Sequence, residues 1–252
     1  FLFILKGLGY AGCSGLCGRG RVISSMNIDW QAFLLTAQLA GLTTVILLVL
    51  ATPLAWWLAH SQRPWIGWVE ALIALPLVLP PTVIGFYLLL LFAPESGPGA
   101  WWFSLTGEPL NFSFTGLVIA SVIYSLPFAT QPIQGAFSSV SSGVLEAGAT
   151  LGASPLDRFV RLVLPLSRRG YLTAAVLVFA HTLGEFGVVL MIGGNIPGET
   201  RVISVALYEA VETLNYGSAH TMAAILLAFS FVVLLVVYAL NRRFSFRLGS
   251  GV

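Results

Sequence analysis

Charged side chains are scarce in this chain, because Asp, Glu, Lys and Arg together make up only 9% of its 252 residues. A typical soluble domain has about 25% charged residues. Apolar residues account for 57% of the sequence, and the mean hydropathy is +0.91. This composition excludes a soluble globular domain, and the net charge of +2 gives no indication of nucleic-acid binding. We therefore predict an all-α integral membrane protein that forms one transmembrane domain.

The motifs of the common catalytic sites are also missing. The sequence has no GxxxxGK[ST] nucleotide-binding loop and no lysine after Lys6, so any ATP hydrolysis must occur on another subunit. It has no GxSxG nucleophile motif. Cys13 and Cys17 are the only cysteines, and they have no nearby His with which to form a metal site. We expect no catalytic residue, no metal site and no cofactor.

Residues 1–25 differ from the rest of the chain. They hold the only lysine and both cysteines, whereas Met26 begins a segment typical of a natural N-terminus. We expect residues 1–25 to be an upstream-translated or non-native extension and residues 26–252 to be the working domain. A signal peptide is the alternative, but its apolar stretch covers only Phe1–Leu5 and is followed by a glycine-rich tract.

Long apolar runs are abundant, and a transmembrane helix needs about 20 such residues. We predict five spans, at 33–59, 68–93, 114–137, 171–192 and 219–240. Prolines should break or kink the second span and interrupt the third; they are Pro76, Pro80, Pro81, Pro127 and Pro132. Residues 200–214 contain charged side chains and predict a re-entrant or shallow helix.

The distribution of arginines predicts the orientation. Arginines occur in the 60–67 loop, between the third and fourth spans, and after Leu240, whereas the 94–113 loop has no basic residue and the 193–218 loop has only Arg201. Cytoplasmic loops carry the excess of Lys and Arg. Five spans then place the N-terminus outside and the C-terminus in the cytoplasm.

The stretch Glu146–Gly170 is too charged to lie in hydrocarbon and must form an ordered structure on one side of the membrane. Residues 145–153 predict one short helix, and Pro155 can begin a second, which Pro165 should end. We expect two helices that lie across the membrane surface and can dock on another protein. An ordinary amphipathic loop helix is the alternative.

The motif in this stretch resembles the cytoplasmic coupling loop of ABC importer permeases. The resemblance places the loop at residues 144–169, and the matching positions are Glu146, Ala147, Gly148, Leu151, Gly152, Ala153, Asp157, Phe159, Leu164 and Pro165. The family usually has Ala where this chain has Gly148, which is a small change. The resemblance implies a fold like that of type I importer permeases and a loop that inserts into a groove of an ATPase subunit. Gly152→Asp, which puts bulk and charge into a tight helix turn, should uncouple ATP hydrolysis from uptake.

A second resemblance concerns the substrate. The run Gly184–Gly187 (GEFG), the run Asn195–Thr200 (NIPGET) and the tract 75–83 (LPLVLPPTV) resemble permeases of molybdate importers. Sulfate and thiosulfate permeases share GEFG or GEYG but are less similar over Asn195–Thr200. The resemblance implies an oxyanion permease of the bacterial inner membrane, for molybdate and possibly tungstate, with a sulfate or thiosulfate permease as the alternative.

The resemblance also implies the partners and the pathway. Two copies of the chain would form a homodimer with two ATPase subunits, and a separate binding protein outside the membrane would capture the oxyanion. Residues at broken helix ends are the translocation or gate candidates; they are Pro80, Pro81, Thr82, Gly184, Glu185, Gly187 and Asn195. The spans contain no Lys or Arg that would trap a dianion, which permits such a pathway without proving it.

His181 and Glu185 are the notable ionisable pair within a span. Their i, i+4 spacing puts them on one helix face. A proton-coupled secondary carrier could use them, in which case Glu185→Gln would abolish transport. A metalloprotease would need a second His, which the HTLGE sequence lacks. We favour a structural role for Glu185.

Overall fold

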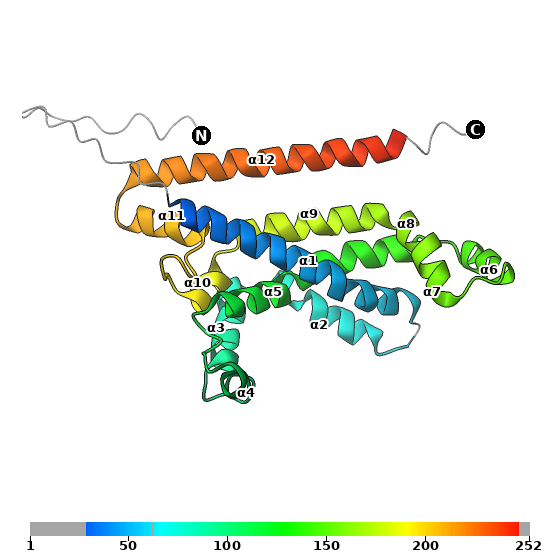
Figure 1. Cartoon of the computed structure of the whole chain (residues 1–252), viewed down its shortest axis with the longest axis horizontal. Helices are drawn as coiled ribbons and strands as arrows, with labels where there is room; N and C mark the ends of the chain where they lie inside the picture. Colours follow the sequence, from blue (N-terminus) through cyan, green and yellow to red (C-terminus); the bar gives the residue numbers. More distant parts are fainter. Residues whose placement is uncertain (1–28, 62, 247–252) are drawn as a thin grey trace, which may run out of the picture.

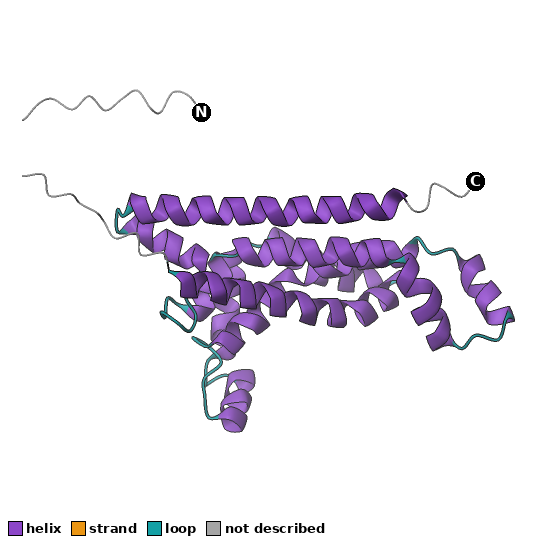
Figure 2. Ribbon diagram, turned by 45° about the horizontal axis from the view of Figure 1, so that its top comes forward, coloured by secondary structure: helices purple, strands orange, loops and turns teal. Residues whose placement is uncertain are grey.

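The computed structural model describes residues 29–246 except residue 62, and its only regular elements there are helices (Figure 2). The predicted extension 1–25 lies outside the described residues. The helices, in chain order, are α1 Trp30–His60, α2 Ile66–Val78, α3 Pro81–Phe92, α4 Gly97–Thr106, α5 Phe114–Ser138, α6 Ser142–Thr150, α7 Pro155–Arg158, a π-helical turn Phe159–Val163, α8 Leu164–Leu166, α9 Arg168–Gly184, α10 Gly187–Gly193, α11 Ile203–Glu212 and α12 Tyr216–Phe246.

The centre of the molecule is a bundle of α1, α5 and α9, which contact one another along their lengths (Figure 1). Small residues on α1 let the helices approach closely, because Ala40, Ala51 and Ala55 are completely buried. Leu47 of α1, Ile133 of α5 and Val178 of α9 fill the space between them. α12 lies beside this bundle and contacts α9 and α11.

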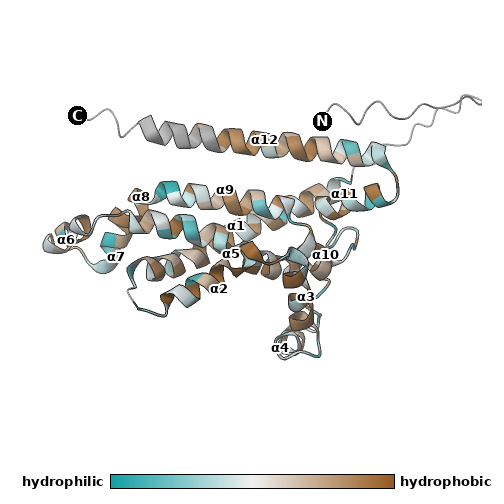
Figure 3. Cartoon of the chain, turned by 180° about the vertical axis from the view of Figure 1, so that it is seen from behind, coloured by the Kyte–Doolittle hydropathy of each residue, from teal (hydrophilic) through white to brown (hydrophobic). Residues whose placement is uncertain are grey.

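The structure confirms a membrane protein built from apolar helices. α1, α5 and α12 are each long and apolar enough to cross a membrane, and two bent helix pairs raise the total to as many as five among the described residues. The predicted break in the second span is confirmed, because α2 and α3 meet at an angle of 110° at Leu79–Pro80. Apolar residues cover much of α2 and α3 (Figure 3).

Three details of the predicted elements are wrong. α5 continues through Pro127 and Pro132 as one helix, because its neighbours hold it in place on both sides. The fourth span does not run to residue 192, since α9 ends at Gly184 and a separate α10 follows. The loop 94–113 contains α4, which Ser96 caps. The second surface helix ends at Leu166, one residue beyond Pro165, where the chain turns by 67° into α9.

The ends of the long helices are arranged consistently with alternating spans. α1 begins at the end of the bundle far from α6 and α7, and α12 ends near the end from which α6 and α7 project (Figure 1). The predicted helix within 200–214 is present as α11, near the start of α1. We call the projecting segment, residues 144–169, the platform.

Candidate functional site

The first part of the platform is α6, whose end is fixed by main-chain hydrogen bonds. The amide of Gly152 donates to the carbonyl of Ala149, and the amide of Ala153 donates to the carbonyl of Gly148. Gly152 has a φ of +82°, so this is a Schellman motif, in which a left-handed residue closes the helix. No atom outside the neighbouring residues lies within 4 Å of a Cβ placed on Gly152. The expected effect of bulk at this position is therefore wrong, and backbone conformation is the reason that the turn requires glycine.

Side-chain contacts join α6 to the second half of the platform. Arg158 donates from Nη1 to the carbonyl of Leu145 over 3.3 Å. A Cβ on Gly148 would lie 2.9 Å from Cδ1 of Leu162, so the glycine allows α6 to lie directly against the π-helical turn. Ser154 caps α7 by accepting from the amide of Asp157.

Phe159 attaches the platform to the bundle. Its ring makes an edge contact with Trp56 of α1, with ring centres 5.2 Å apart, and lies 5.9 Å from the ring of Phe137 on α5. Val163, one turn later, is completely buried. Phe159 thus packs the platform against both α1 and α5.

Exposed apolar side chains cover the outer side of the platform. Leu151 is 87% exposed, Leu156 is 72% exposed and Val160 is 49% exposed. Glu146, Ala147 and Asp157 are exposed beside them, and Asp157 pairs with Arg161 over 3.5 Å. Because the charged residues keep this segment out of hydrocarbon, the exposed leucines are typical of a surface that binds another protein. Of the matching positions, Gly148 and Phe159 pack inward, while Leu164 and Pro165 are exposed at α8.

At the other end of the bundle, Glu185 occupies the break between α9 and α10. It is only 4% exposed. Oγ of Ser121 on α5 donates to Oε2 of Glu185 over 2.9 Å, and Oγ of Ser204 on α11 donates to its main-chain carbonyl over 2.7 Å. Oε1 has no hydrogen-bond partner among the residues that the structure describes. Glu185 thus connects three elements at a point where the helix is interrupted.

His181 has partners of its own. Its Nδ1 lies 2.8 Å from Oγ of Ser125, and its ring stacks on Phe128 with centres 4.1 Å apart. Within the described chain no hydrogen bond joins His181 to Glu185, since each binds a different serine of α5. The i, i+4 spacing of Ser121 and Ser125 in an apolar span was a signal that sequence reasoning missed.

A cavity of about 490 Å³, which we call the outer cavity, brings most of the predicted pathway residues together. Five of the seven candidates line it, namely Pro81, Thr82, Gly184, Glu185 and Gly187. Pro80 immediately precedes α3, next to the cavity. A Cβ on Gly187 would lie 2.8 Å from Cβ of Pro81, so glycine is needed where α10 approaches α3. Tyr124 and His181 complete the polar lining.

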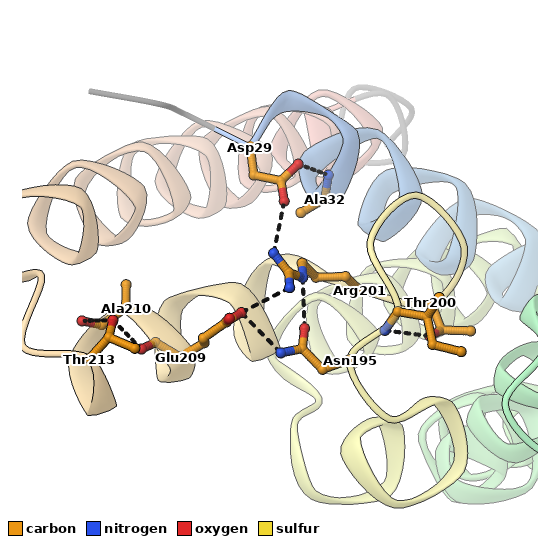
Figure 4. A network of polar contacts seen from close by, with 9 residues as sticks. Asp29, Ala32, Asn195, Thr200, Arg201, Glu209, Ala210 and Thr213 are labelled. Carbon is orange, nitrogen blue, oxygen red and sulfur yellow. Dashed lines mark hydrogen bonds and ion pairs between the residues drawn. The ribbon is translucent and has the colours of Figure 1, made fainter. Parts of the chain in front are cut away.

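Asn195, unlike Pro80, lies away from this cavity. It belongs to a polar network around Arg201 (Figure 4). Nε of Arg201 donates to Oδ1 of Asn195 over 2.7 Å, and Nη2 lies 3.2 Å from Oε2 of Glu209. Asp29, just before α1, lies 3.9 Å from Nη1 of the same arginine. The network holds α11 and the preceding loop against the start of α1, which is a structural role.

A second cavity, which sequence reasoning missed, lies nearer the platform. It has a volume of about 330 Å³ and is lined by Glu70 of α2 and by Gln131 and Gln134 of α5. The presence of Glu70 inside a predicted span was the signal that could have revealed it. No group of three or more His, Cys, Asp or Glu residues within the described part of the chain could hold a metal ion.

Comparison with known proteins gives a consistent result. Residues 48–246 match the family described as "Binding-protein-dependent transport system inner membrane component". The chain is 52% identical over 217 residues to the molybdenum transport system permease protein ModB of Azotobacter vinelandii, which covers 86% of this chain and 96% of the relative. The ModB protein of Escherichia coli K12 is 34% identical over 209 residues, or 82% of this chain and 91% of that protein.

More distant proteins share the same architecture. The sulfate transport system permease protein CysT of a Synechocystis strain is 32% identical over 220 residues, covering 87% of this chain and 74% of that protein. Among solved structures, a bacterial alginate ABC transporter in complex with an alginate-bound periplasmic protein has a TM-score of 0.70 at 18% identity, with 86% of this chain and 80% of the other covered. At that identity the likeness concerns the fold alone.

Proposed function

The chain belongs to the family of binding-protein-dependent transport system inner membrane components, and from this membership we propose that it is the membrane-spanning subunit of an ATP-driven molybdate importer. The observation that supports molybdate as the substrate is the 52% identity to a molybdenum permease over 96% of that relative's length. The sulfate permeases are less similar, at 32% identity or below for those compared. The protein is a transport subunit and not an enzyme, and tungstate, which has the same tetrahedral shape and charge, is an expected second substrate.

The platform is the proposed docking site for the ATPase subunit. Its support is the combination of exposed Leu151 and Leu156 with an inward-packed Phe159. The exposed leucines would enter an apolar groove of the ATPase, and the aromatic contacts would pass its movement to α1 and α5. In this proposal the exposed coupling positions would contact the ATPase, and the inward-packed Gly148 and Phe159 would hold the platform together; the exposed ones are Glu146, Ala147, Leu151, Gly152, Asp157, Leu164 and Pro165.

The remaining partners follow from the same proposal. A second copy of the chain would complete the pathway, and a binding protein outside the membrane would deliver the oxyanion. The platform and the end of α12 would face the cytoplasm, and the start of α1 would face outward, as the arginine distribution predicts. Residues 26–252 would belong to the transmembrane domain.

The outer cavity is the proposed entrance to the pathway. Thr82 and Tyr124 supply hydroxyl groups to its lining. Such groups attract an anion weakly and release it again, unlike a buried arginine. Closure of the ATPases would open this end, and ATP hydrolysis would return the pathway to the inward-open state.

The experiment is co-purification of the chain with its ATPase subunit, followed by reconstitution in proteoliposomes with the molybdate-binding protein outside. ATP-dependent uptake of labelled molybdate, competed by tungstate and only weakly by sulfate, is expected. Stronger competition by unlabelled sulfate than by unlabelled molybdate would instead indicate a sulfate permease. Uptake without any ATPase subunit would refute the proposal and favour a secondary carrier.

A further inference from the structure

The cavity near the platform, which we call the inner cavity, has polar and charged side chains in its lining. Nε2 of Gln134 donates to Oε1 of Glu70 over 2.7 Å, and both residues lie in helices of the membrane bundle. Glu70 and Gln131 are exposed in the single chain. A carboxylate and amides exposed on membrane helices face water or protein, because contact with lipid is too costly. This face of α2 and α5 is therefore turned toward water or another protein chain and not toward lipid.

The inner and outer cavities are both lined by the segment α2–α3 and by α5. On α2 and α3, Glu70 and Ala74 line the inner cavity and Thr82 lines the outer one. On α5, which runs in the opposite direction, Gln131 lines the inner cavity and Tyr124 the outer one. The order is the same on both walls, so the two cavities follow each other along α5.

Phe128 lies between them. Tyr124, Phe128 and Gln131 have the spacing i, i+4, i+7 and thus share one face of α5. Phe128 lines neither cavity, and its ring stacks on His181 of α9 at an interplanar angle of 28°. Ser125 holds His181 through Nδ1, and the ring of Tyr124 lies 4.8 Å from it.

We propose that the stacked rings of Phe128 and His181 form a gate that separates the outer from the inner cavity and closes the oxyanion pathway in this conformation. The inference rests on the proposed transport function. Apolar constrictions stop ions because an ion must lose its water to pass them. A tetrahedral dianion is strongly hydrated, so two rings in contact are an effective barrier to it.

The helix that carries Phe128 is built to bend at this level. Pro127 and Pro132 lie on either side of the gate residue, and each lacks the amide that would bind the carbonyl four residues earlier. The carbonyls of Ile123 and Phe128 therefore receive no helical hydrogen bond from these positions. Bending α5 here breaks fewer bonds than elsewhere, which allows the platform to move Phe128 off His181.

The test uses the complete complex of permease, ATPase and binding protein in proteoliposomes loaded with molybdate. Phe128→Ala should raise ATP-independent efflux about tenfold, which corresponds to a barrier lowered by about 1.4 kcal/mol. Phe179→Ala is the matched control, because Phe179 is also half-buried and contacts one ring, that of Phe229, at a distance from both cavities. Efflux from Phe128→Ala equal to that of the control would overturn the gate.

A second measurement does not depend on that variant folding or on the identity of the substrate. After Cys13 and Cys17 are replaced by serine, Gln131→Cys is exposed to a membrane-impermeant thiol reagent from each side in the absence of ATP. Labelling only from the platform side, with Thr82→Cys labelled only from the other side, is expected. Labelling of Gln131→Cys from both sides with Phe128 present would overturn the gate. Failure of ATP-dependent molybdate uptake by the unmodified complex would instead refute the proposed function.

Discussion

Substitution of Gly152 tests the platform most directly, because the structure separates backbone conformation from bulk and from charge. Gly152 adopts a φ of +82° at the end of α6, and there is open space around it. Alanine in that conformation costs about 1–2 kcal/mol without any clash. Such a cost lowers the population of the native turn by a factor of about 5–30.

Alanine, asparagine and aspartate at position 152 should differ in how much each destabilises the turn. Asparagine tolerates the left-handed conformation and should behave nearly like glycine. Aspartate has the same shape as asparagine but places a negative charge at a helix C-terminus, at a further cost of about 0.3–1 kcal/mol. Gly143→Ala, in the first turn of α6 with ordinary space around it, is the control and should be neutral or slightly stabilising.

Two measurements on the reconstituted complex check this reasoning. Hydrogen exchange at the amide of Ala153, which donates to the carbonyl of Gly148, should become faster in Gly152→Ala and Gly152→Asp but not in Gly152→Asn. The amount of molybdate taken up per ATP hydrolysed should fall in the same two variants. Unchanged exchange would refute the conformational argument. Faster exchange with normal uptake per ATP would show that this turn plays no part in coupling.

Three further predictions concern the other end of the bundle. Ser121→Ala leaves the buried Glu185 carboxyl without its hydrogen-bond donor on α5 and should lower the free energy of unfolding by about 1–3 kcal/mol, measured by denaturation in detergent against exposed Ser104→Ala. Glu185→Gln keeps a side chain of the same shape and should retain ATP-dependent uptake, whereas complete loss of transport with the complex intact would support a proton-coupled carrier. Arg201→Gln removes the cation that two carboxylates share and should destabilise the detergent-solubilised protein by about 1 kcal/mol, with high salt reducing the difference from the unmodified chain.

The sequence was sufficient for the membrane class and for most of the helices, and five of the seven pathway candidates line one cavity. Apolar length and arginine placement are local properties, so they could be found without a structure. The tract around Pro80 and Pro81 and the run around Glu185 were predicted separately, and the fold brings them to one cavity. The docking positions and the gate remain predictions that the experiments above address.

The errors depend on contacts between helices. Prolines were expected to interrupt the third span, but packing of α5 against α1 and α9 outweighs two missing hydrogen bonds. The end of α9 at Gly184 could not be found from hydropathy, because α10 continues the apolar run after a break of two residues. The stack of Phe128 on His181 depends on two helices far apart in the sequence, and no local pattern predicts such a contact.

The shortness of α2 has a consequence for how this part of the chain meets the membrane. Its 13 residues extend about 20 Å at 1.5 Å per residue, whereas the hydrocarbon layer is about 30 Å thick. α2 alone therefore cannot cross that layer, and the 110° turn into α3 lies at membrane depth. The main-chain polar groups of the turn must face protein or water there, because lipid offers them no hydrogen bonds.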